Sequence, residues 1–134
     1  MSRVVTSGYF DPLHIGHLEC LELAKGLGDS LIVIVNSDHQ AKLKKGRSFM
    51  SEQDRMKIVS SLKCVDSVFL SIDKDKTQCE SLKYLNPDIF AKGGDRTSDE
   101  IPEASICKEL NITIVDGLGK KIRSSSGYTG LIDE

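Results

Sequence analysis

The sequence predicts an α/β fold in which a doubly wound sheet of about five parallel strands carries helices on both faces. Two observations predict it. Short apolar, β-branched runs alternate with segments of helical periodicity along the chain, and the run from Ser30 to Asn36 is apolar almost throughout. Such a run suits a parallel strand that is buried on both faces. The length of 134 residues fits one domain, so we expect residues 1–134 to form a single domain.

The first strand and helix follow from residues near the N-terminus. Arg3 to Ser7 contains two adjacent valines and predicts a short buried strand that runs into a loop at Gly8. A helix is expected from about Ile15 to Leu27, because apolar residues recur every three positions on one face. Gly26 and Gly28 supply the stop signal.

A basic segment follows the second strand. Gln40 to Arg47 is polar and carries four cations close together, and we expect it to be a loop. Ser51 then has the character of a helix N-cap, with acidic residues in the turn after it. The helix that it opens is expected to run to about Leu62.

The remaining elements continue the alternation. Strands are expected at Ser67 to Ser71, Asp88 to Ala91 and Ile112 to Val115, with helices at Thr77 to Tyr84 and Pro102 to Leu110. Ser124 to Ser126 is a poor candidate for a last helix, because two glycines follow it. In a sheet of this kind ligands bind outside the carboxyl ends of the strands, where the strand order reverses.

The composition excludes several function classes. The net charge of −2 provides no overall field that favours nucleic acid or a membrane, so we expect neither as a partner. No stretch approaches the ~20 apolar residues of a membrane helix, and the N-terminus does not resemble a signal peptide. The four cysteines are scattered, which favours reduced and mostly buried thiols in a cytoplasmic protein.

The segment from Gly8 to His17 carries the chemistry. A strand ends, a glycine lets the backbone turn, and a helix begins whose free N–H groups and dipole favour an anion. His14 and His17 are three residues apart, so they are expected to share one face of the first helical turn. Gly16 lies between them and lets a ligand approach the backbone. Two imidazoles beside a helix N-terminus suit a polyphosphate.

Two other interpretations of these residues remain. The histidine pair could form half of a zinc site with Asp11, although no further Cys or His lies at ligand spacing, and we therefore expect no protein-bound metal. The lysines of the basic segment could be a solvated surface, as surface lysines usually are.

The chain resembles a known family. The segment GYFDPLHIGH is similar to the H-x-G-H signature of the cytidylyltransferase-like nucleotidyltransferase superfamily, and the likeness extends over roughly residues 3 to 126. Phe90 to Asp95 is similar to the K-G-G-D turn of the heptose-phosphate adenylyltransferase domain, while the small size resembles glycerol-3-phosphate cytidylyltransferase. The resemblance implies a Rossmann-like fold.

The resemblance also implies roles for individual residues. His14 and His17 would bind phosphates and stabilise the transition state, and Lys44, or its neighbour Lys42 or Lys45, would reach the α-phosphate or the acceptor. Arg55 would hold the acceptor or phosphates. The nucleotide would also contact the backbone at Ser7, Gly8 and Phe10 and the neighbouring residues Asp11 and Gly16. Its base and ribose would lie near the turn formed by Gly93, Gly94 and Asp95. Its β- and γ-phosphates would contact Ser124 and Ser125.

The implied activity is nucleotidyl transfer. A nucleoside monophosphate from ATP or CTP, bound with Mg²⁺, would pass to a phosphorylated small molecule such as a sugar phosphate or polyol phosphate, and pyrophosphate would leave. Relatives commonly form homodimers, so a homodimer is implied. The segment Gly119 to Ser126 departs from the R-T-E-G-I-S-T-S motif of many cytidylyltransferases. A non-catalytic nucleotide-binding module that regulates a partner is the alternative.

Overall fold

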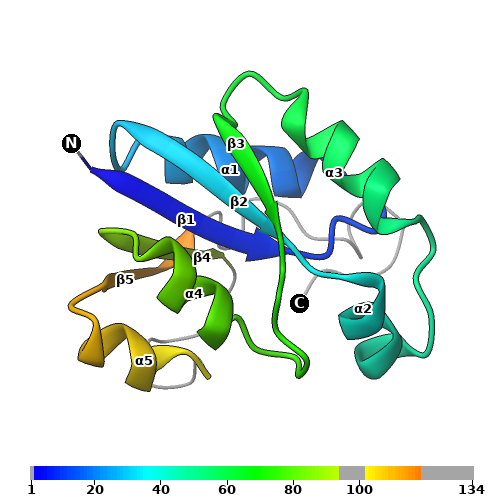
Figure 1. Cartoon of the computed structure of the whole chain (residues 1–134). Helices are drawn as coiled ribbons and strands as arrows, with labels where there is room; N and C mark the ends of the chain where they lie inside the picture. The colour runs from blue at the N-terminus through cyan, green and yellow to red at the C-terminus, as the bar shows by residue number, and fades with distance from the viewer. Residues whose placement is uncertain (1, 94–101, 119–134) are drawn as a thin grey trace.

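Five parallel strands form one sheet in the computed structural model, which describes residues 2–93 and 102–118 (Figure 1). The strands are β1 (Arg3–Gly8), β2 (Ser30–Val35), β3 (Ser67–Leu70), β4 (Ile89–Gly93) and β5 (Thr113–Leu118). Their order is β3-β2-β1-β4-β5, and every neighbouring pair is parallel. The predicted fold class, a doubly wound parallel sheet, is confirmed.

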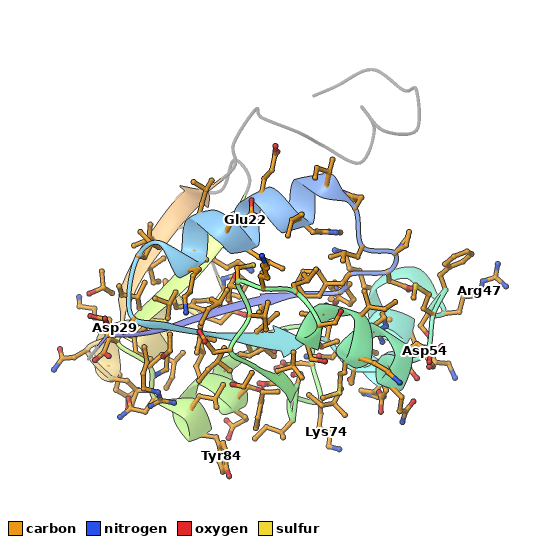
Figure 2. All side chains as sticks on the ribbon, turned by 90° about the horizontal axis from the view of Figure 1, so that it is seen from above. Glu22, Asp29, Arg47, Asp54, Lys74 and Tyr84 are labelled. Carbon is orange, nitrogen blue, oxygen red and sulfur yellow. The ribbon has the colours of Figure 1, made fainter. Side chains whose placement is uncertain are left out.

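Helices cover both faces of the sheet. On one face lie α1 (Ile15–Lys25) and α3 (Glu52–Ser60), and on the other lie α4 (Cys79–Leu85) and α5 (Ala104–Glu109). In Figure 2, Glu22 of α1 and Tyr84 of α4 lie on opposite sides of the sheet.

Each face of the sheet has its own apolar core. Val4 packs with the α1 and α3 side, while Val5, the next residue of the same strand, packs with the α4 and α5 side. Both side chains are fully buried, as the alternation of a strand between two helical layers requires. The buried central strands therefore form a rigid base, and their carboxyl ends are held in fixed positions for the loops that follow.

One predicted loop is wrong. The lysines after β2 lie on a helix, α2 (Asp38–Lys45). A capping box starts this helix: Ser37 Oγ accepts the Gln40 backbone N–H at 3.1 Å, and Gln40 Oε1 accepts the Ser37 N–H at 3.1 Å. Gly46, at φ 88°, ends it in the left-handed conformation that glycine adopts without strain. The capping box outweighs the polar composition that favoured a loop.

The other described elements match the predictions within a few residues. Ser51 is the N-cap of α3 and accepts the Asp54 N–H at 3.2 Å. α1 ends at Lys25, earlier than expected, and β4 continues through Gly93, where we expected a turn. The segment Ser124 to Ser126 lies outside the described residues.

The cysteines are free thiols, but only Cys107 is buried; Cys20, Cys64 and Cys79 are partly buried. The expectation of mostly buried thiols is therefore wrong for three of the four. Within residues 2–93 and 102–118, no helix has the length and apolarity to cross a membrane.

Candidate active site

Three strands end level with one another at the edge of the sheet. Gly8 at the end of β1 is in register with Val35 of β2, and Val35 is in register with Leu70 of β3. On the other side, the β1–β4 pairing ends at Thr6 and Ala91, where the Thr6 hydroxyl donates to the Ala91 carbonyl at 2.7 Å. The next described helix after β1, α1, lies on one face, and the next after β4, α5, lies on the other, so this end of the strands is the switch point where a ligand site is expected.

The two histidines of the first loop form the start of α1. His14 is the N-cap rather than a residue of the first turn, and its Nδ1 accepts the Gly16 N–H at 3.1 Å. The Nδ1 of His17 in turn accepts the His14 N–H at 3.2 Å. The two rings are stacked, with centroids 3.9 Å apart and an interplanar angle of 22°. The spacing of the two histidines predicted that they lie close together, but it did not predict that they cap the helix reciprocally.

The capping bonds determine where each ring carries its proton. An Nδ1 atom that accepts a backbone N–H has no proton of its own, so each neutral imidazole carries its proton on Nε2. Burial, and to a smaller extent the charge on His14, lowers the pKa of His17 to about 4. Burial also lowers the pKa of His14. At neutral pH the pair therefore consists of two neutral rings with their protons on Nε2 rather than of two cations.

Phe10 packs against the histidine pair and against Gly8. Phe10 is buried, has a left-handed φ of 52°, and meets the His17 ring edge-on with centroids 5.1 Å apart. Its ring lies so close to Gly8 that a Cβ there would be 2.7 Å from Phe10 Cζ. A side chain at Gly8 would displace the Phe10 ring, which packs against His17. Ser7, the residue before Gly8, lies in β1 opposite Ile34.

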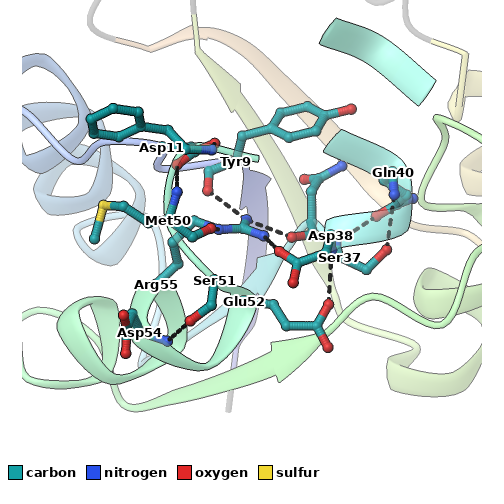
Figure 3. Close-up of polar contacts among 12 residues, drawn as sticks. Tyr9, Asp11, Ser37, Asp38, Gln40, Met50, Ser51, Glu52, Asp54 and Arg55 are labelled. Carbon is teal, nitrogen blue, oxygen red and sulfur yellow. Dashed lines mark hydrogen bonds and ion pairs between the residues drawn. The ribbon is translucent and has the colours of Figure 1, made fainter. Parts of the chain in front are cut away.

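Arg55 of α3 is fully buried beneath the same loop (Figure 3). Its Nη1 donates to the carbonyls of Tyr9 at 2.9 Å and Asn36 at 2.6 Å, and its Nε donates to the Met50 carbonyl at 3.0 Å. Its Nη2 pairs with Asp38 Oδ1 at 2.7 Å. The guanidinium thus ties the loop after β1 to the end of β2, the start of α2 and the segment before α3.

Asp11 connects the same loop to the segment before α3. Its two carboxylate oxygens accept the backbone N–H groups of Phe49 at 2.7 Å and Met50 at 2.6 Å. The carboxylate thus fixes the chain between α2 and α3 against the loop that carries the histidines.

Within residues 2–93 and 102–118, no group of three or more His, Cys, Asp or Glu side chains is arranged to hold a metal.

The lysines of α2 lie beside this loop. Lys42 and Lys44 are exposed, and the Lys44 Nζ lies 4.6 Å from the centroid of the Tyr9 ring. Lys45 belongs to the same helix. The contact with the Tyr9 ring places the Lys44 ammonium beside the residues that follow β1.

The remaining predicted residues fall in two groups. Gly16 is in the first turn of α1 and Gly93 ends β4 at the same edge of the sheet. Gly94, Asp95, Ser124 and Ser125 lie outside the described residues. Tyr9 and Asn36 were not predicted, and no sequence signal marks them, because their partners come from distant segments.

A family model described as cytidylyltransferase-like matches residues 5–125 of the chain. The match covers the histidine loop, α2, Arg55 and β4.

Curated relatives are similar over most of the chain. The bifunctional protein HldE of a Nitratiruptor species is 43% identical over 117 residues, or 85% of this chain and 25% of the relative. The bifunctional protein HldE of one Helicobacter pylori strain is 42% identical over 108 residues, or 79% of this chain and 23% of the relative. The chain thus spans about a quarter of the length of these relatives.

Solved structures share the fold. A lipopolysaccharide core biosynthesis protein from Thermoplasma volcanium GSS1 is 32% identical, with a TM-score of 0.75 over 87% of this chain and 95% of that one. A pantoate-β-alanine ligase from Francisella tularensis is 15% identical, with a TM-score of 0.59 over 98% of this chain and 66% of that one, and supports the fold alone.

Proposed function

The chain belongs to the cytidylyltransferase-like family, a family of nucleotidyltransferases, and from this premise we propose that it transfers a nucleoside monophosphate from an NTP to a phosphorylated small molecule. Pyrophosphate is the second product. The observation that carries the proposal is the stacked histidine pair at the start of α1, whose Nδ1 atoms are occupied by backbone N–H groups. Both neutral rings therefore carry their proton on Nε2, and an N–H group of this kind suits a phosphate oxygen.

The proposed reaction needs no general base and no protein nucleophile. An oxygen of the acceptor phosphate attacks the α-phosphorus in line, a new P–O bond forms, and the bond to the β-phosphate oxygen breaks as pyrophosphate leaves. The attacking oxygen is already ionised near pH 7, because the second pKa of a phosphate monoester is about 6. The protein must therefore align two anions and offset their repulsion.

The described residues meet this demand in two ways. His14 and His17 donate neutral N–H bonds to phosphate oxygens at the α1 N-terminus, where the helix dipole favours negative charge. Lys44 supplies a full positive charge from α2. Neutral donors orient the phosphates, and the lysine offsets the charge that develops at the α-phosphate.

The resemblance implies that Arg55 contacts phosphate directly, but we propose a different role for it. Its guanidinium is buried and makes four hydrogen bonds to protein acceptors. It therefore acts as a positioning residue that fixes the chain after β1 and the start of α2 relative to each other. Asp11 does the same through the Phe49 and Met50 amides.

The Mg²⁺ ion enters as part of the substrate. The side chains of the site are N–H donors, which suit phosphate oxygens, whereas Mg²⁺ prefers oxygen ligands and retains several waters. The triphosphate and water would therefore coordinate Mg²⁺, and the ion would neutralise phosphate charge.

The nucleotide and the acceptor follow from the resemblance. The K-G-G-D turn, with Gly93, Gly94 and Asp95 near base and ribose, favours ATP and a sugar phosphate, and the HldE relatives support the same branch of the family. CTP and a polyol phosphate are the second candidate pair. Ser124 and Ser125 are proposed to contact the β- and γ-phosphates, and the enzyme is proposed to be a cytoplasmic homodimer.

Pyrophosphate release tests the proposal. The protein is incubated with each of four NTPs and with sugar and polyol phosphates, and we expect release with one nucleotide and one acceptor class. His17→Gln should abolish most of it, while His39→Gln, the same change at an exposed histidine of α2, should not. Tight nucleotide binding without any turnover would instead favour the non-catalytic module.

A further inference from the structure

Tyr9 and Asn36 are brought together at the ends of adjacent strands. The Asn36 N–H donates to the Gly8 carbonyl at 2.9 Å, which extends the β1–β2 pairing beyond the strands. Arg55 Nη1 then bonds the carbonyls of both Tyr9 and Asn36. The backbone positions of these two residues are therefore fixed relative to each other.

The Tyr9 backbone is held by a buried partner. Its carbonyl accepts a hydrogen bond from Arg55 Nη1 at 2.9 Å, and the buried Asn36 side chain interacts with its phenol. Burial raises the pKa of the phenol, so the ring is neutral at physiological pH. A neutral phenol presents the negative face of its π-system to a cation.

The cation at this ring is Lys44. Its Nζ lies 4.6 Å from the ring centroid, within the ~6 Å range of a cation–π contact. The helix that carries it is anchored at its other end, where the buried Gln40 side chain donates to the carbonyls of Asp75 at 2.8 Å and Thr77 at 3.0 Å. With the α2 backbone fixed, the position of the ammonium depends on the contacts of its flexible stem.

We propose that Tyr9 is a positioning residue for Lys44: its ring holds the ammonium above the end of β1 before nucleotide binds. The role of that ammonium in phosphate transfer rests on the proposed function, whereas the contact itself does not. The ring attracts the cation less strongly than a triphosphate does, so it orients Lys44 without competing with the substrate.

The contact is tested first without nucleotide, by competitive acetylation of lysines followed by mass spectrometry. Lys57, an exposed lysine of α3, is the internal reference. Tyr9→Leu should raise the relative reactivity of Lys44 by ~2–5-fold, as expected for loss of one cation–π contact. Tyr9→Phe keeps the ring and should stay close to wild type. An unchanged reactivity in Tyr9→Leu would overturn the proposal.

A variant of Lys44 tests the same contact and serves if the Tyr9 variants do not fold. Lys44→Met changes an exposed side chain and should shift the aromatic ¹H resonances of Tyr9. Tyr84, which stacks on Phe69, is the matched control and should not shift. Unchanged Tyr9 resonances would contradict the contact.

Steady-state kinetics then separates positioning from mere packing. Tyr9→Leu should lower kcat by ~2–5-fold with little change in the KM for NTP, because the fixed ammonium acts in the transition state. Tyr9→Phe should keep the kcat of the wild type, and Tyr84→Leu should leave kcat unchanged. An unchanged kcat in Tyr9→Leu would overturn the positioning role. Failure of the wild type to release pyrophosphate would count against the proposed function, while the acetylation result would still decide the contact.

Discussion

The His17 ring accepts the backbone N–H of His14 through Nδ1 at 3.2 Å, so a residue that we propose to bind phosphate also caps the helix on which it lies. His14 does the same for the Gly16 N–H. Each ring is thus fixed in orientation and in tautomer before any ligand arrives. Prearranged donors of this kind lose little on binding and can be aimed where negative charge develops.

The double role of His17 can be separated by two substitutions. Gln is a natural capping-box residue at this helix position, so His17→Gln should keep the bond to the His14 N–H, whereas His17→Ala removes it. Both should lower pyrophosphate release by ~10²–10³-fold. Only His17→Ala should lose ~0.5–2 kcal/mol of unfolding free energy, measured by urea denaturation. Normal turnover in His17→Gln would show that the imidazole is not needed.

The lowered pKa of His17 predicts a pH dependence of stability. The folded-state pKa is about 4 and lies below the ordinary value of 6.5, so the unfolded chain binds the proton more tightly. The stability contributed by the neutral ring is fully present above pH 6.5 and is lost as the pH falls toward 4. Urea unfolding across this range should show a smaller loss in His17→Gln than in wild type. Parallel curves for the two proteins would contradict the assigned pKa.

Arg55 should matter to the fold. Arg55→Met leaves the buried Asn36 carbonyl and the partly buried Tyr9 carbonyl without their donor, which should cost about 2–4 kcal/mol of unfolding free energy. Arg47→Met, a similar change at an exposed arginine, should change stability by less than about 0.5 kcal/mol. Urea denaturation of both variants measures the difference. Full stability of Arg55→Met together with a raised KM for NTP would instead indicate a direct phosphate contact.

The lysines of α2 should not be equivalent. Lys44 contacts the Tyr9 ring above the strand ends, so Lys44→Met should lower pyrophosphate release by about 10²-fold, the effect of losing one donor to developing charge. Lys42→Met removes an exposed cation from the same helix and should have a much smaller effect. Initial rates at saturating substrates decide between them. A larger loss in Lys42→Met would assign the catalytic role to that residue.

Much of the fold could be predicted because its elements are locally encoded. The apolar run at Ser30 to Asn36 and the N-cap at Ser51 each determine an element through nearby residues. The error at α2 came from weighing charge over the S-x-x-Q capping signature of Ser37 and Gln40, which was present in the sequence.

The site was harder to predict than the fold. The histidine spacing identified its centre, because the two residues belong to one helix start. The burial of Arg55 and the contact of Tyr9 with Lys44 depend on segments that are ~35–46 residues apart, and only the folded sheet brings them together. The tautomers of His14 and His17 depend on backbone N–H directions that sequence does not reveal.

Imidazole ¹⁵N NMR of His14 and His17, recorded with and without the Mg²⁺–NTP complex, tests the proposed phosphate site most directly. At pH 7 and without nucleotide we expect both rings to be neutral with the proton on Nε2. On addition of the nucleotide that supports transfer, we expect both Nε2–H resonances to shift. A proton on Nδ1 of either ring, or Nε2 resonances that do not move at saturating nucleotide, would contradict a phosphate site built from this histidine pair.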